Sequence, residues 1–170
     1  GFENVWREAR SLNQILVEVF TANDIPVISF SPSSMIIADN KTIKMWDIAP
    51  IKKALNAGLI PLIYGDVIFD LSIGGTILST EELFEHLALS LKPEKILIAG
   101  IEDGVWQDFP TNQYLIDLIT QDTEPDFFEN LGGSNFVDVT GGMAEKVKSM
   151  LNLYKHLPNL EINIFSGINN

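Results

Sequence analysis

Apolar residues recur along the chain at spacings that predict several helices. Near the start they stand three and four residues apart, which predicts an amphipathic helix of about five turns that ends before Pro26. The same spacing predicts a short helix over 49–57 and longer helices that begin near Ser79 and Thr140. The apolar positions of the first helix are Val5, Ala9, Leu12, Leu16 and Val19.

Short apolar runs between these helices predict strands over residues 26–30, 59–64, 95–99 and 160–165. Helices that alternate with buried strands predict an α/β fold with a largely parallel sheet, in a single domain over residues 1–170. Ligands bind beyond the carboxyl ends of such strands. The loops to inspect therefore cover residues 31–35, 64–76, 99–106 and 139–146. The polar stretch 107–138 predicts a mobile or meandering connection.

Charge and composition narrow the classes of function. The 170 residues include 23 acidic and 11 basic side chains, a formal net charge of −12, which argues against a nucleic-acid partner. The chain has no cysteine and two histidines, so disulfides, thiolate zinc sites, cysteine nucleophiles and histidine-rich metal sites are excluded. No apolar run reaches the roughly 18 residues that would span a bilayer, and we expect a cytoplasmic protein that does not bind membranes.

Gly65 and Asp66 follow the predicted strand over 59–64, where ligands bind in α/β folds. Gly65 would let a backbone approach a ligand closely, and Asp66 could bind a hydroxyl group, a cation or a lysine. The alternative is a turn formed by the ordinary conformational preferences of glycine and aspartate.

Asp103 and Gly104 follow the strand over 95–99 in the same way. With Glu102 and Asp108 nearby, these carboxylates could help to hold magnesium, which prefers oxygen ligands. A short Asp-Gly turn is the simpler interpretation, and no residue is assigned as a metal ligand.

Gly141 and Gly142 open the last predicted helix. Bare N–H groups at a helix N-terminus form a ready phosphate cradle, and Lys146, about one turn further on, could reach the same anion. The alternative is a glycine-rich helix start followed by a solvated lysine, because the spacing is not that of a Walker A loop.

Other polar groups have structural interpretations. Ser79 and Glu82 have capping-box spacing. Glu81 faces a different direction from Glu82, so these two carboxylates cannot share a proton. His86 and His156 lie within predicted helices, where a surface or helix-dipole role is expected.

The order of these motifs resembles the amino acid kinase superfamily, and most closely its isopentenyl phosphate kinase branch. The most specific part is the run 138–143, DVTGGM, followed by Lys146 and preceded in the chain by Gly65-Asp66-Val67. The other matching stretches are Gly1-Phe2 with Arg10 and Asn13, Asp24-Ile25-Pro26-Val27, Pro32-Ser33-Ser34, Ile51-Lys52, Ile77-Leu78-Ser79 and Asp103-Gly104-Val105.

The resemblance implies a three-layer αβα sandwich with a mainly parallel sheet, usually a homodimer. It implies transfer of the γ-phosphoryl group of ATP, with Mg²⁺, onto a small phosphorylated acceptor. In this branch isopentenyl phosphate becomes isopentenyl diphosphate, in an alternative mevalonate route of isoprenoid biosynthesis.

The same resemblance assigns roles to individual residues. Lys146 and Asp66 are expected to be catalytic, Lys146 by neutralising charge on the transferring group and Asp66 by organising the site between acceptor and nucleotide. The nucleotide is expected to contact Asp103, Gly104, Gly141, Gly142 and Lys146. The acceptor is expected to contact Gly65 and Thr80.

Three features depart from the family pattern. The family begins with a K-L-G-G-S strand-turn and an H-G-G-G-x-F-G-H segment; neither occurs here, and the last stretch of the family domain is missing too. We therefore expect an internal fragment that is inactive by itself. Ile101 replaces an aspartate that contacts the nucleotide in T-D-V-D-G-V, and Thr80 replaces the glycine of S-G-D-D.

Two other functions stay open. Ile101 and Thr80 would also suit a non-catalytic or regulatory nucleotide-binding relative. A phosphonate kinase of the fosfomycin type shares the fold and would differ only in its acceptor.

Overall fold

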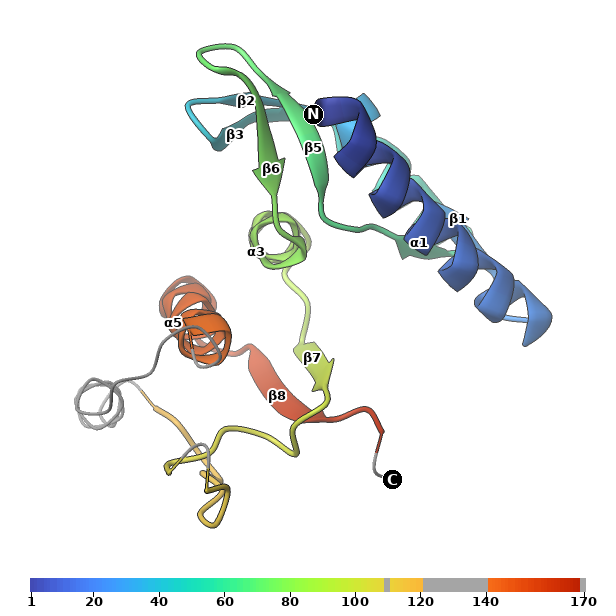
Figure 1. The fold of residues 1–170 in the computed structure, drawn as a ribbon. Coiled ribbons are helices and arrows are strands. Elements are labelled where there is room, and N and C mark those ends of the chain that lie inside the picture. Colours follow the sequence, from blue (N-terminus) through green and yellow to red (C-terminus); the bar gives the residue numbers. More distant parts are fainter. Residues whose placement is uncertain (109–110, 121–140, 169–170) are drawn as a thin grey trace. The chain divides into compact units, whose positions relative to one another are not determined.

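A computed structural model of the chain describes residues 1–108, 111–120 and 141–168. Its internal contacts divide the chain into two compact units, Gly1–Leu87 and Ala88–Asn170 (Figure 1). Each unit has its own strands and core. The expectation that residues 1–170 form a single domain stays a prediction.

The first unit begins with the predicted amphipathic helix, α1, over Phe2–Ala22. It packs against β1 (Val27–Ser29) and β5 (Asp66–Asp70) and turns its one buried side chain, Asn13, inward. The helix ends at Ala22 with Asn23 as its C-cap, and Asp24 then adopts a positive φ of 57°. The chain reverses there, so that Pro26 lies outside the helix and directly before β1.

A parallel pair of strands follows α1. β1 (Val27–Ser29) pairs with β4 (Ile60–Leu62), and α2 (Ala49–Asn56) precedes β4. This crossover suits the right-handed βαβ connections of α/β folds. The predicted strands at 26–30 and 59–64 and the predicted helix at 49–57 are confirmed.

A four-stranded sheet in the same unit was not predicted. Its order is β3-β2-β5-β6, with antiparallel pairs β2–β3 and β5–β6 around a parallel pair β2–β5. Figure 1 shows the two hairpins next to each other. The strands are β2 (Ile36–Asp39), β3 (Thr42–Trp46), β5 (Asp66–Asp70) and β6 (Gly74–Leu78).

The second hairpin corrects the sequence prediction for residues 64–76. These residues were expected to form a ligand-binding loop, but most of them belong to β5 and to the turn before β6. The turn between β2 and β3 was hard to predict from the sequence. The two residues that adopt a positive φ there are Asn40 and Lys41 (φ of 50° and 65°). Asn-Gly is the usual pair at such positions.

The first unit is held by an aliphatic core between its sheet and helices. Its most deeply buried side chains come from β2, α2, β5, β6 and α3 (Thr80–Leu91), and each is at most 1% exposed. They are Ile36, Ile51, Ile68, Leu78 and Leu83. The helix predicted to begin near Ser79 is confirmed as α3, and its Leu83 and Leu87 side chains are both buried.

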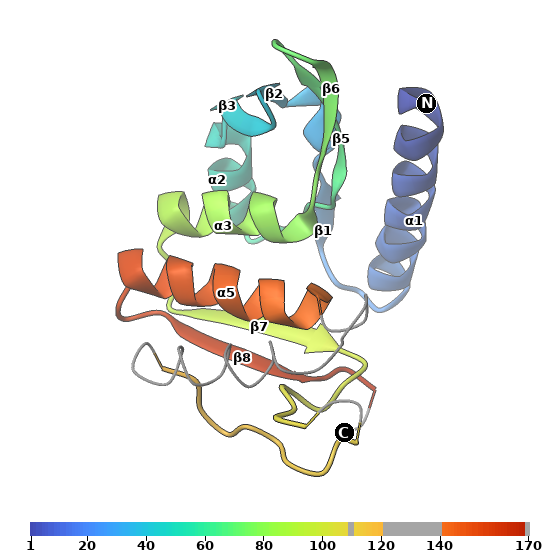
Figure 2. The same ribbon diagram turned by 60° about the vertical axis from the view of Figure 1, so that its left-hand side comes forward.

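The second unit is built on one parallel strand pair. β7 (Lys95–Gly100) and β8 (Glu161–Ser166) are paired along their full lengths, and α5 (Gly141–His156) lies along them (Figure 2). Met150 and Leu153 of α5 pack in one apolar cluster, and Val147 and Leu151 in a second. The predicted strands and the predicted last helix are confirmed.

The α/β class is confirmed. Among the strands of the described residues, the parallel pairs are β1–β4, β2–β5 and β7–β8. Of the polar stretch 107–138, residues 109–110 and 121–138 lie outside the described part. None of the described helices is both long and apolar enough to cross a membrane.

Candidate functional site

Asp66 is the first residue of β5 and is only 1% exposed. Its Oδ1 accepts the N–H of Val67 at 2.8 Å, and its Oδ2 accepts the N–H of Ser33 at 3.2 Å. Both carboxylate oxygens are therefore engaged by main-chain donors. A buried carboxylate needs such partners because leaving it without them would be costly. Asp66 thus holds the segment after β1 against the start of β5.

Ser33 belongs to a single 3₁₀ turn, Pro32–Ser34, which is separated from the end of β1 by two residues. The hydroxyl groups of Ser31 and Ser33 are 2.9 Å apart and hydrogen-bonded. Because β1 and β4 are parallel neighbours, this turn and the Gly65-Asp66 segment lie at the same edge of the pair. Ser33 received no role from the sequence, although it lies in the predicted loop over residues 31–35.

Gly65 lies in close contact with the start of α3. A Cβ atom at this position would come within 3.2 Å of both the Leu78 carbonyl oxygen and the Thr80 nitrogen. The Gly65 N–H donates to Oγ1 of Thr80 at 3.1 Å. The structure therefore brings together Gly65 and Thr80, the predicted acceptor contacts, with Asp66, the predicted catalytic residue that follows Gly65 in the chain.

The capping box of α3 is confirmed. The Ser79 N–H donates to Glu82 Oε2 at 2.7 Å, and the Glu82 N–H donates to Ser79 Oγ at 3.2 Å. These reciprocal bonds satisfy donors at the helix start. Glu82 therefore has a structural role at the start of α3.

A second acidic residue, Asp70, organises the far end of the two hairpins. Its carboxylate accepts main-chain N–H groups of Asn40, Lys41, Ser72 and Ile73, with donor–acceptor distances of 2.7–3.1 Å. Burial raises the pKa of Asp70, but these four donors outweigh it and hold the pKa below the usual value. Asp70 thereby fixes the β2–β3 turn against the β5–β6 turn.

Asp39 reinforces the same region. It accepts a hydrogen bond from Lys44 Nζ at 2.7 Å and another from the Ser72 hydroxyl at 2.6 Å. The Lys44 bond, aided by Ser72, lowers the pKa of Asp39. The sequence did not single out either aspartate, because the hairpins that bring their partners together were not predicted.

The residues after β7 form a compact local structure. Gly104 is buried, and a Cβ atom there would come within 3.1 Å of the Leu115 side chain. Packing is therefore sufficient reason for a glycine at this position. Asp103 is exposed, and its expected contact with a nucleotide stays a prediction.

The neighbouring carboxylates are used within the protein. Glu102 accepts bonds from the Trp106 indole at 2.9 Å and from Asn112 Nδ2 at 3.3 Å. Asp108 bonds Thr111 and the N–H groups of Gln113 and Tyr114. The Thr111 hydroxyl, aided by these N–H groups, keeps the pKa of Asp108 low.

The described residues contain no group of three or more histidine, aspartate or glutamate side chains that could hold a metal ion. Glu102 and Asp108 are instead engaged by other donors. This donor set does not fit a metal bound by the protein alone.

Gly141 is the first residue of α5, as the sequence predicted. Gly142 is exposed, and nothing lies within 4 Å of the position that a Cβ atom would take. Lys146, half-buried, follows one turn later on the same helix. A helix start with an exposed glycine followed by a lysine suits an anion chemically. Contact of these residues with a nucleotide stays a prediction.

The two histidines have different surroundings. His156 lies in the last turn of α5, where its Nδ1 is 2.9 Å from the Asn152 carbonyl oxygen. His86 stacks on Trp46 of β3, with ring centroids 5.4 Å apart. Burial lowers the pKa of His86. It is therefore a packing residue, which the sequence did not predict.

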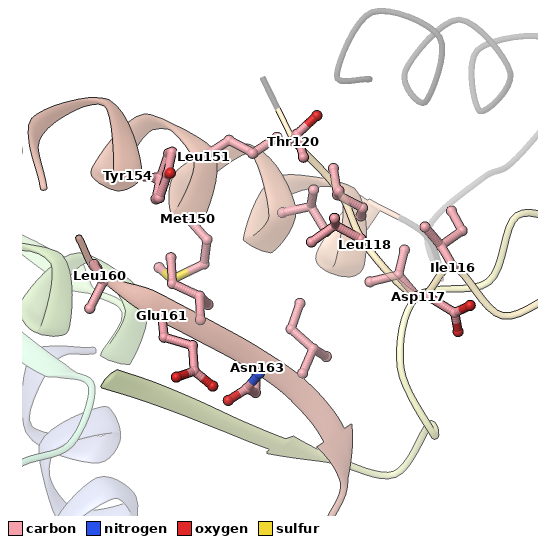
Figure 3. A pocket seen from close by; sticks show the side chains of 15 residues that line it. Ile116, Asp117, Leu118, Thr120, Met150, Leu151, Tyr154, Leu160, Glu161 and Asn163 are labelled. Carbon is pink, nitrogen blue, oxygen red and sulfur yellow. The ribbon is translucent and has the colours of Figure 1, made fainter. Parts of the chain in front are cut away.

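A cavity of about 400 Å³ lies in the second unit between α5, β8 and the segment 116–120 (Figure 3). Most of its described lining is apolar, and that lining includes Asp117 and Glu161 but no lysine or arginine. Asp103, Gly104, Gly142 and Lys146 do not line it. Its charge does not suit a triphosphate, and we do not assign it to the nucleotide.

The fold and the order of these residues agree with comparisons against known proteins. The model of the amino acid kinase family matches residues 6–166. The chain therefore belongs to the amino acid kinase family.

Within that family the chain is similar to isopentenyl phosphate kinases. It is 35% identical over 147 residues to the enzyme of Methanocaldococcus jannaschii, covering 86% of this chain and 54% of that protein. It is 32% identical over 153 residues to the enzyme of Methanothermobacter thermautotrophicus, covering 89% of this chain and 58% of that protein. The chain thus spans little more than half the length of these relatives.

Solved structures show the same likeness. An isopentenyl phosphate kinase structure matches with a TM-score of 0.70 at 26% identity, over 92% of this chain and 57% of that one. An isopentenyl phosphate kinase solved as a substrate complex matches with a TM-score of 0.76. At 18% identity that second match supports the fold alone.

Proposed function

We propose that the protein containing this chain transfers the γ-phosphoryl group of ATP to a small phosphorylated acceptor. The best candidate is isopentenyl phosphate, whose product is isopentenyl diphosphate in the alternative mevalonate route. The observation that carries the proposal is the buried Asp66, next to Gly65, at the edge formed by β1 and β4. Similarity to isopentenyl phosphate kinases over 86% of the chain supports it.

The proposed acceptor side lies in the first unit. Gly65 and Thr80 would contact the acceptor, and Asp66 would keep the surrounding main chain in place. Asp66 acts through its bonds to the Ser33 and Val67 N–H groups. A residue held in this way can position donors without reorganising during the reaction.

The proposed nucleotide side lies in the second unit. The N–H groups of Gly141 and Gly142 would bind phosphate oxygens of ATP, with Asp103 and Gly104 as further contacts. Lys146 would neutralise charge on the transferring group. Ile101, which replaces the family aspartate, is 78% exposed and adds no charge near Asp103.

The proposed reaction forms one P–O bond and breaks another. An oxygen of the acceptor phosphate attacks the γ-phosphorus of ATP, and the bond to the β,γ-bridging oxygen breaks, so that ADP leaves with the electron pair. Charge spreads over the transferring oxygens in this step. Fixed donors and one lysine are therefore the main protein contributions.

We also propose that ATP reacts as its magnesium complex, with the ion on the phosphates. We propose as well that the protein forms a homodimer and is located in the cytoplasm. Exposed apolar side chains on α1, among them Leu12 (62%), Ile15 (56%) and Val19 (53%), support a further partner surface. Light scattering of the complete protein would test the dimer, and a monomer would refute it.

The test of function is ADP release from magnesium-ATP by the protein expressed from its complete reading frame. Isopentenyl phosphate, fosfomycin and no acceptor are compared in parallel. Release that requires isopentenyl phosphate would support the proposal. Release only with fosfomycin would make the protein a phosphonate kinase.

The second candidate is a non-catalytic or regulatory nucleotide-binding relative. The exposed Ile101 favours it, because the family has an aspartate at that position. Calorimetry separates the two: ATP binding without ADP release from any of these acceptors would favour the binding role.

A further inference from the structure

Thr80 is the first residue of α3, but its hydroxyl group is not part of the helix cap. Ser79 and Glu82 form that cap between themselves. The Thr80 Oγ1 instead accepts the main-chain N–H of Gly65, fifteen positions earlier in the chain, at 3.1 Å. A threonine side chain thus joins the start of α3 to the segment between β4 and β5.

The contact between these segments is tight. A Cβ atom on Gly65 would lie 3.2 Å from the Thr80 nitrogen and 3.4 Å from its Oγ1. The main chain of Gly65 therefore rests directly on Thr80. The absence of a side chain at Gly65 allows this approach.

Through Gly65 the contact with Thr80 is connected to Asp66. Asp66 follows it directly, and its buried carboxylate holds the N–H of Ser33 at 3.2 Å. A series of two hydrogen bonds from main-chain N–H groups to side-chain oxygens, linked by the peptide bond between Gly65 and Asp66, thus runs from α3 to the turn after β1. It joins the three segments around the proposed acceptor site.

We propose that Thr80 is a positioning residue for the acceptor. Its hydroxyl holds the Gly65-Asp66 main chain in place and engages the Gly65 N–H, which is then not a donor to the acceptor phosphate. This proposal rests on the proposed function above. The family pattern has a glycine at this position, which offers no hydroxyl, so the bond is a feature of this chain.

Two substitutions at Thr80 separate the hydroxyl from the shape of the side chain. Thr80→Val keeps the branched shape and removes the hydroxyl, whereas Thr80→Ser keeps the hydroxyl. Thr42→Val on the exposed surface of β3 is the matched control, because Thr42 lies outside the proposed site. Each variant is made in the protein expressed from its complete reading frame.

The kinetic readout is the KM for isopentenyl phosphate, measured beside the KM for ATP. Loss of one hydrogen bond predicts an increase of about fivefold in the acceptor KM of Thr80→Val. The KM for ATP should stay within about twofold, and Thr80→Ser should recover most of the change. Thr42→Val should match the wild type.

A second readout does not depend on activity. Hydrogen exchange of the peptide that contains Gly65 should be faster in Thr80→Val than in the wild type or in Thr80→Ser. A hydrogen-bonded amide exchanges only when the bond opens. Unchanged exchange would show that the Thr80 hydroxyl does not hold Gly65, and would overturn the proposal.

Two kinetic results would also overturn it. They are an unchanged acceptor KM in Thr80→Val, and an equal rise in the KM values of acceptor and ATP. If the wild type transfers no phosphoryl group to any acceptor, the proposed function fails and the acceptor role fails with it. Faster exchange in Thr80→Val would then still demonstrate the hydrogen bond.

Discussion

The carboxylate of Asp66 accepts the main-chain N–H of Ser33 at 3.2 Å, so one buried side chain joins the segments that follow the parallel strands β1 and β4. Its other oxygen is bonded to Val67. Asp66 therefore stabilises the first unit as well as serving the proposed acceptor site. A substitution there should change stability and turnover together.

Asp66→Asn should lower both turnover and stability. An amide presents an NH₂ group where one carboxylate oxygen now accepts an N–H, and an unsatisfied buried donor costs about 1–3 kcal/mol. Urea unfolding and kcat with saturating substrates measure the two effects. Asp24→Asn, at an exposed residue whose positive φ suits asparagine, is the control. Unchanged kinetics in Asp66→Asn would remove Asp66 from the site.

Lys146→Ala should reduce turnover far more than it reduces stability. Removing one group that stabilises charge in the transition state typically costs about a hundredfold or more in kcat. The matched control is Lys148→Ala, an exposed lysine on the same helix. If both variants lose the same small amount of activity, or if Lys146→Ala mainly unfolds the protein, Lys146 is not catalytic.

Gly142→Ala tests the proposed nucleotide side without a steric cost to the fold. Nothing lies within 4 Å of the new Cβ position, and alanine in place of glycine in a helix should stabilise by about 0.5–1 kcal/mol. If ATP phosphates approach this main chain, the KM for ATP should nevertheless rise. A stabilised variant with an unchanged KM for ATP would exclude Gly142 from the binding site.

Gly65→Ala should instead lower the stability of the protein. The new Cβ would press on the main chain of Leu78 and Thr80 at 3.2 Å, and main-chain atoms cannot rotate away as side chains can. The cost of forcing such a contact is typically about 1–3 kcal/mol. Thermal unfolding of this variant beside Gly142→Ala would measure the contrast. Equal melting temperatures would contradict the close packing of Gly65 on α3.

The lowered pKa of Asp70 predicts how the stability of the protein depends on pH. Its folded-state pKa lies below the usual value of about 3.9. Its stabilising effect is therefore fully present above that value, and is lost as the pH falls through the lowered pKa. Asp70→Asn should be clearly less stable than the wild type at pH 7, and the two should converge in strong acid. A difference that does not shrink in acid would refute the role of ionised Asp70.

The elements with strong local signals were predictable from sequence. The apolar spacing of α1, α3 and α5 and the capping box at Ser79 and Glu82 each depend on nearby residues only. The same holds for the glycine pair before Met143. These features follow from local conformational preferences, which the sequence displays directly.

The hairpins and their aspartate clamps were not predictable in the same way. Asp70 is four residues from Asp66 along the chain, yet its N–H donors at Asn40 and Lys41 lie about thirty positions away. The bond between Thr80 and Gly65 likewise depends on the return of the chain through β5 and β6. Interactions of this kind require the tertiary fold and leave no periodic signal in the sequence.

The most direct test follows the label from [γ-³²P]ATP in a mixture of isopentenyl phosphate, magnesium and the protein expressed from its complete reading frame. The proposed function predicts that the label appears in isopentenyl diphosphate, and that Lys146→Ala transfers it far more slowly than Lys148→Ala. Label that stays in ATP, or that leaves only as inorganic phosphate, would contradict phosphoryl transfer to this acceptor.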